Sequence, residues 1–208
     1  MNVPGGPGKL PLAIRNMALA CMALSALVGF FSLTELLALL QPADPARLPL
    51  QLPGTFGNEA FRKGIEAQRA AVEAMRVPRV LTLSALGMAC ALNFVAASRL
   101  IWPRGLRRES MRRLVVGSSV AVALLRTLDG AQLTVVARRV GGAMARAADS
   151  IPGLTQLTPV EAEGAVLSLV VSVAVLQTAV LVGAFAFVSH YFRTPRARQV
   201  FEALDNPR

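Results

Sequence analysis

Side chains that carry catalysis or hold metal ions are scarce in this chain. Its 208 residues include one histidine, His190, and two cysteines, Cys21 and Cys90. The sequence has no H-E-x-x-H, no phosphate-binding glycine loop and no G-x-S-x-G, the motifs that set a nucleophile, a base or a metal ligand at useful spacing. The cysteines have no C-x-x-C spacing and fall in apolar runs, where thiols are ordinary small residues. We therefore expect no catalytic residue, no metal, no cofactor and no enzymatic activity.

Charged residues are also few, at 16% against 54% hydrophobic residues, and four long apolar runs separate them. A helix rises about 1.5 Å per residue and the hydrocarbon core of a bilayer is about 30 Å thick, so each run is long enough to cross a membrane. The predicted fold is all-α: a polytopic membrane protein with one four-helix transmembrane domain over residues 17–192. The four runs are 17–40, 80–102, 114–137 and 164–189.

The net charge of +10 is distributed as expected for a membrane protein and does not indicate nucleic-acid binding. Arginines crowd the segment between the second and third runs, and the predicted disordered tail 1–16 and the tail 193–208 are also basic. Cytoplasmic segments are enriched in Lys and Arg, so both termini are predicted to lie inside. Trp102 and Tyr191 end their runs on that side, where amphipathic rings favour the headgroup layer. The arginines expected to contact anionic lipid headgroups are Arg104, Arg107, Arg108, Arg112 and Arg113.

The longest segment between apolar runs is 41–79, on the predicted outer side. Four prolines oppose helix formation in its first half, and Asn58 is then a typical N-cap for a helix over 58–76. This helix has an apolar stripe. The simplest interpretation is a helix lying on the membrane or over the bundle. The alternative is a partner-docking helix whose anchors are Phe61, Ile65 and Val72.

The third apolar run contains charges. Arg126 lies 13 residues after Arg113 and 12 before Arg138, which predicts a position near the bilayer midplane. Asp129 and Gln132 follow on the same helical face. Each central charge costs about 2.5–3.5 kcal/mol, whereas the Leu and Val residues of the run return about 3–7 kcal/mol in total, so the charges must be paired and turned inward. A surface helix, leaving three spans, is the alternative, but it would put the C-terminal arginines outside.

Three interpretations of the Arg126–Asp129 pair remain open. It is an ion pair that locks the bundle, with Asn93 and Gln177 as bonding partners; or a second subunit satisfies it; or it lines a path for an ion, proton or substrate, the default hypothesis for intramembrane ionisable groups. An Asp one turn from a permanently charged Arg stays ionised, which favours a structural clamp over a proton carrier.

Helix packing and source can also be predicted. Small residues spaced four apart, such as Ser25 with Gly29 and Gly117 with Ala121, offer faces for close helix contact. The 20 Arg against 2 Lys and the many Ala residues are typical of a high-GC bacterial genome. They predict a bacterial cytoplasmic (inner) membrane.

We therefore expect an accessory or assembly subunit of a membrane complex. Its expected contacts are the lipid bilayer, anionic headgroups, and a protein partner or further copies of itself. The alternative function is a small transporter or channel that is completed by oligomerisation and uses the Arg126–Asp129 polar face.

Overall fold

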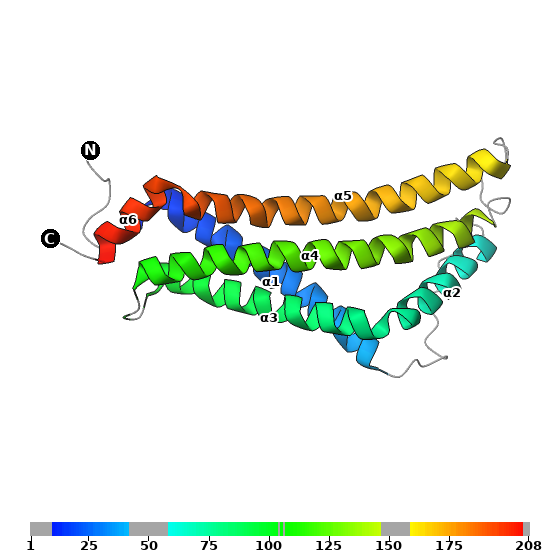
Figure 1. Ribbon diagram of the computed structural model, residues 1–208, viewed down its shortest axis with the longest axis horizontal. Helices are drawn as coiled ribbons and strands as arrows, with labels where there is room; N and C mark the ends of the chain where they lie inside the picture. Colours follow the sequence, from blue (N-terminus) through cyan, green and yellow to red (C-terminus); the bar gives the residue numbers. More distant parts are fainter. Residues whose placement is uncertain (1–9, 42–57, 104, 106, 147–158, 206–208) are drawn as a thin grey trace. The chain divides into compact units, whose positions relative to one another are not determined.

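The computed structural model describes residues 10–41, 58–103, 105, 107–146 and 159–205. These residues form six helices and no strands, which confirms the predicted all-α class (Figure 1). Residues 1–9 of the predicted N-terminal tail lie outside the described ranges. The helices are α1 (Leu12–Leu40), α2 (Asn58–Ala74), α3 (Arg76–Ile101), α4 (Arg108–Ala145), α5 (Pro159–Arg193) and α6 (Pro195–Asp205).

Four of the described helices are long and apolar enough to cross a membrane: α1, α3, α4 and the part of α5 from 164 to 193. Each helix begins before its predicted apolar run, whereas α1 ends with its run at Leu40 and α3 ends at Ile101, one residue short of its run. α1 begins at Leu12, so residues 12–16 of the predicted tail 1–16 are helical. With its 38 residues, α4 is about 57 Å long, about twice the thickness of the hydrocarbon.

The chain divides into two compact units, each built from parts of the same long helices. The sequence predicted one domain over 17–192 and carries no signal for this division, because α3, α4 and α5 pass from one unit to the other without a break. Unit 1 comprises Met1–Leu37, Thr82–Thr127 and Val180–Arg208, and unit 2 comprises Ala38–Leu81 and Leu128–Ala179.

Unit 1 packs parts of α1, α3, α4 and α5 around an apolar core. A Cβ atom added at Gly29 would lie 3.2 Å from the Cβ of Cys90, so α1 and α3 approach closely at the predicted small pair Ser25–Gly29. Both cysteines of the chain are buried and free. The core cluster nearest the middle of the helices consists of Val28, Leu86, Cys90, Val122 and Phe185.

The predicted C-terminal tail 193–208 contains a helix, α6, that packs on unit 1. The Thr194 hydroxyl accepts a hydrogen bond from the Ala197 amide at 3.4 Å, and Pro195 occupies the first helical position. This is a typical helix start, because Thr caps the free amides and proline needs no hydrogen bond there. Phe201 is fully buried, with its ring centroid 6.4 Å from that of Phe192 at the end of α5.

Unit 2 is held by glycines that let its helices approach closely. A Cβ atom at Gly130 of α4 would lie 2.9 Å from the Cβ of Thr178 on α5, which is closer than such atoms come in proteins. A Cβ at Gly141 would lie 3.2 Å from the Cα of Leu167. These glycines are 11 residues apart, about three helical turns, so they share one face of α4. By contrast, Gly117, which was predicted to offer a face for close helix contact, has nothing within 4 Å of an added Cβ atom.

Gly130→Ala should destabilise the protein by about 1–3 kcal/mol, because the added methyl group overpacks the contact between α4 and α5. Gly117→Ala is the matched control on the same helix. It should be neutral or stabilising by up to about 1 kcal/mol, since alanine favours helix and its methyl group meets open space. Thermal unfolding in detergent measures both. Equal effects of the two substitutions would show that Gly130 is not a packing contact.

Candidate functional site

Arg79 is buried inside a helix, although the sequence assigned it to the outer loop 41–79. The predicted helix 58–76 ends two residues early, at Ala74, and α3 begins at Arg76 after a turn at Met75. Pro78 therefore falls in the first turn of α3, where a proline removes no helical hydrogen bond. The Arg79 amide donates to the Met75 carbonyl at 3.0 Å, and its side chain has no exposed surface.

An ion pair joins Arg79 of α3 to Asp129 of α4. Nη2 of Arg79 lies 3.7 Å from Oδ1 of Asp129, and both side chains are 0% exposed. Arg79 directly precedes the predicted apolar run of α3, which begins at Val80. Arg126, the predicted partner, is also buried, at 9% exposure, one turn earlier on α4.

A second buried polar cluster, in unit 1, centres on Asn93. Its amide nitrogen donates to the Ser25 hydroxyl of α1 at 3.1 Å, and its carbonyl oxygen accepts from the Ser118 and Ser119 hydroxyls of α4 at 2.8 and 3.3 Å. Ser25 in turn donates to the Cys21 carbonyl at 2.8 Å. Asn93 therefore ties α1, α3 and α4 together. It was predicted to bond with Arg126 and Asp129, and the hydrogen bonds seen at its side chain are instead to these serines.

The remaining members of the predicted polar set are placed differently. Gln132 is half-buried on α4, whereas the Gln177 side chain on α5 is exposed. The structure thus brings Asp129 to Arg79 and Asn93 to three serines. Arg79 and the serines were missed because an arginine beside a proline resembles a loop residue and because single serines are common in apolar runs.

Arginines at the predicted inner end of unit 1 form hydrogen bonds near the start of α4. Arg112 binds Glu109 through two hydrogen bonds of 2.7 Å and donates to the Phe192 carbonyl of α5 at 2.6 Å. Arg113 also donates to Glu109, at 3.0 Å. These residues precede the apolar run that begins at Leu114. The hydrogen bonds from Arg112, with support from Arg113, lower the pKa of Glu109 to about 2, so this carboxylate stays charged at physiological pH.

The carboxylate of Asp205 caps the N-terminus of α4. Its two oxygens accept hydrogen bonds from the backbone amides of Arg108 at 3.0 Å and Glu109 at 2.9 Å. The first amides of a helix have no partner within it, and a negative charge there also complements the helix dipole. Because Asp205 is the last residue of α6, the cap fastens α6 to α4. A cavity of about 240 Å³ beside the cap is lined by Arg107, Glu109, Ser110, Arg113, Glu202 and Asp205.

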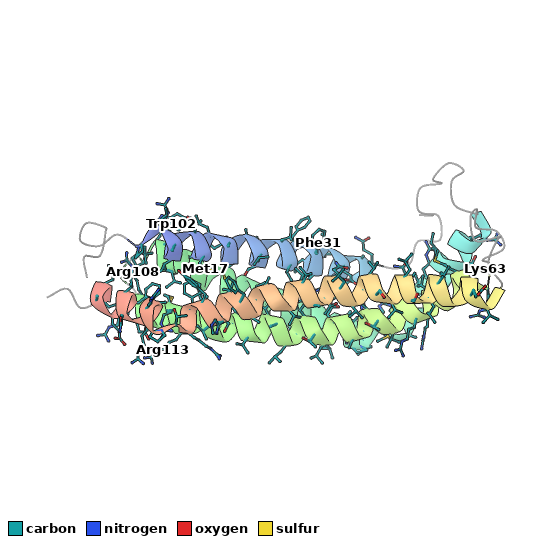
Figure 2. The ribbon with its side chains drawn as sticks, turned by 90° about the horizontal axis from the view of Figure 1, so that it is seen from above. Met17, Phe31, Lys63, Trp102, Arg108 and Arg113 are labelled. Carbon is teal, nitrogen blue, oxygen red and sulfur yellow. The ribbon has the colours of Figure 1, made fainter. Side chains whose placement is uncertain are left out.

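The arginines predicted to contact anionic lipids differ in their surroundings. Arg107 and Arg113 are exposed, Arg108 is half-buried, and Arg112 is 8% exposed with its donors directed at Glu109 and Phe192. Arg104 lies outside the described residues. Figure 2 shows Arg108 and Arg113 at the same end of unit 1 as Trp102 and Met17. The lipid interpretation stays a prediction, and its most accessible donors are those of Arg107 and Arg113.

The predicted docking helix, α2, packs on α4 along part of its surface. Gly64 and Ala71 are buried, and a Cβ at Gly64 would lie 2.8 Å from Cγ of Met144. Ile65 and Val72, two of the predicted anchors, are half-buried. The side chain of Phe61 lies outside the described part of the structure. The predicted anchors therefore belong to a helix that already packs one stripe of its surface on α4.

The buried polar groups described here lie between neighbouring helices, at Arg79 with Asp129 and at Asn93 with its serines. Among the described residues, no group of three or more His, Cys, Asp or Glu side chains could hold a metal ion. No family model, no curated protein and no solved structure matches the chain. The fold places the chain in the class of multi-pass helical membrane proteins.

Asp129→Leu alone should destabilise the protein by about 3–5 kcal/mol, because it leaves the Arg79 charge buried without the carboxylate. Replacing both Arg79 and Asp129 by leucine should recover most of this loss. The exposed pair Arg62–Glu66, with side chains 72% and 67% exposed, is the control, and its removal should change stability by about 0–1 kcal/mol. Chemical denaturation in detergent measures the set. A double variant as unstable as Asp129→Leu would contradict the ion-pair argument.

Asp205→Ala should cost about 0.5–2 kcal/mol, the usual effect of removing a helix cap, whereas Asp205→Asn should retain most of the stability. Glu202→Ala is the control on the same helix, because Glu202 pairs with Arg198 on the exposed surface at 2.7 Å. Its effect should not exceed about 0.5 kcal/mol. Thermal unfolding compares the three variants. The capping role would be wrong if Asp205→Ala and Glu202→Ala behaved alike.

Proposed function

We propose that this protein is an accessory or assembly subunit of a complex in a bacterial cytoplasmic membrane, with both termini inside. The observation that supports this best is the burial of the ion pair between Arg79 and Asp129, in which both side chains have no exposed surface. A transport path needs charged or polar groups that water or a substrate can reach. Here the charged groups face one another inside the protein, as expected of groups that hold helices together.

The Asn93 cluster supports the same proposal. Its amide donor and its carbonyl oxygen are both engaged by serine hydroxyls from neighbouring helices, and the Asn93 side chain is fully buried. Such an arrangement fixes the register of three helices. Polar chemistry in the spans is thus used for packing, which suits a rigid subunit that presents surfaces to partners.

The proposed partner-docking surface is the outer helix α2. Ile65 and Val72 are half-buried and lie beside the stripe that attaches α2 to α4. A partner helix that covers this edge would complete the burial of both side chains, as in helix-in-groove recognition. At the predicted inner side, Arg107 and Arg113 would bind anionic headgroups and support the proposed topology.

The test is affinity purification of the tagged chain from its native membrane in mild detergent, followed by intact-mass measurement of the complex. We expect a stoichiometric unrelated protein. The variant Ile65→Ser/Val72→Ser should release that protein, whereas Arg62→Ala/Glu66→Ala, on the exposed side of α2, should retain it. Thermal unfolding of both variants checks that α2 stays folded.

Recovery of this chain alone would contradict the accessory role and favour the alternative, an oligomeric transporter or channel. The observation behind that alternative is the row of Arg126, Asp129 and Gln132 along α4. Flux through reconstituted vesicles should then fall in Asp129→Asn while insertion is unchanged.

A further inference from the structure

The helix α5 is the least enclosed of the four membrane-spanning helices. None of the residues in its most apolar 18-residue stretch is buried, whereas 28–39% of the corresponding stretches in α1, α3 and α4 are buried. In unit 2 its known contacts are on one side, where Leu167 and Thr178 meet Gly141 and Gly130 of α4. Its other side is exposed along several turns.

This exposed side is apolar with helical spacing. Leu169, Val173 and Leu176 are 66%, 59% and 65% exposed, and they follow each other at intervals of four and three residues. That spacing aligns side chains along one stripe, as in the seam of a left-handed helix pair. Lipid tails would cover such a stripe as well as a protein would, so the stripe alone identifies no partner.

The side chain of Gln177 favours a protein partner over lipid on this side of α5. Gln177 lies on the same side of α5, next to Leu176 and one turn after Val173, and its side chain is exposed. It is 13 residues after the start and 12 before the end of the predicted span 164–189, which predicts a position near the bilayer midplane. Lipid tails offer its carboxamide no hydrogen bond, and an unsatisfied polar group in hydrocarbon is costly.

Two other polar residues of α5, Ser168 and Thr178, avoid this cost within their own helix. The Ser168 hydroxyl donates to the Ala165 carbonyl at 3.0 Å, and that of Thr178 donates to the Ala174 carbonyl at 2.9 Å. Among the hydrogen bonds seen in the described residues, none involves the Gln177 side chain. The described residues therefore offer its carboxamide no partner, and a group from a second chain at this depth would satisfy it.

We propose that α5 pairs with α5 of a second copy of this chain through Leu169, Val173, Leu176 and Gln177. A carboxamide carries both donors and an acceptor, so two Gln177 side chains related by a two-fold axis satisfy each other. A two-fold interface brings each residue near its own equivalent, which is the geometry that a single central glutamine requires. The apolar stripe then packs on its own copy on either side of the hydrogen-bonded pair. This pairing does not rest on the accessory role, which concerns an unrelated protein.

Disulfide cross-linking in native membranes tests the pairing. Cys21→Ala and Cys90→Ala first remove both native thiols, and Val173→Cys then places one reporter thiol on the stripe. Oxidation should give a covalent dimer of the full chain. Leu128→Cys is the control, because this side chain is 57% exposed on α4, outside the proposed interface, and should give only background cross-linking.

The role of Gln177 is tested in the same Val173→Cys background. Gln177→Leu should reduce cross-linking by about threefold to tenfold, the range expected from one interhelical hydrogen bond in a membrane. Gln177→Asn keeps a self-complementary carboxamide and should retain most of the dimer. Leucine at this position favours membrane insertion, so loss of the dimer would not reflect loss of the protein.

Three results would overturn the proposal: cross-linking no higher than in Leu128→Cys, cross-linking unchanged by Gln177→Leu, or a covalent product with a different protein in place of the dimer. The outcome is separate from the test of the accessory role. That role fails if no unrelated protein is recovered, whether or not α5 pairs with its own copy.

Discussion

Hydrocarbon supplies no hydrogen bonds, and this constraint explains the partners of the buried polar side chains Asn93 and Asp129. The Asn93 amide is satisfied by Ser25 of α1 and by Ser118 and Ser119 of α4. The Asp129 charge is met by Arg79 of α3. Each of these groups would be costly in contact with lipid, so the helices are stable only in the arrangement that brings them together. A few polar side chains thus select one packing of helices whose surfaces are otherwise similar.

Other helix contacts depend on glycines, which have no side chain to keep the helices apart. Gly130 and Gly141 let α4 approach Thr178 and Leu167 of α5 so closely that an added Cβ would collide with them. Between apolar helices in lipid there is little hydrophobic driving force, so close van der Waals contact has to supply the stability. The polar pairs therefore specify which helices meet, and the glycines allow the helices to come close.

The class of the fold followed from the sequence because apolar run length is a direct consequence of membrane thickness. The bonding partner of each buried polar side chain could not be predicted, since it depends on the register between helices that are far apart in the chain. The i,i+3 spacing drew attention to Arg126 as the partner of Asp129, whereas the structure adds Arg79, 50 residues away. Of the small pairs, Ser25–Gly29 lies at a close contact and Gly117 does not. The helix α6 was missed because Pro195 and several arginines resemble a solvated tail, although Thr194 and Pro195 together are a helix start.

The cap on α4 has a consequence for the order in which the chain matures. Asp205 is synthesised 97 residues after Arg108, whose amide it accepts. During translation, α4 can enter the membrane with its first amides held only by water and headgroups, and the bond to Asp205 forms after α5 and α6 have emerged. The predicted inner end of unit 1 is therefore completed late. A chain that ended between residues 194 and 204 would carry all four candidate spans and would lack the cap on α4.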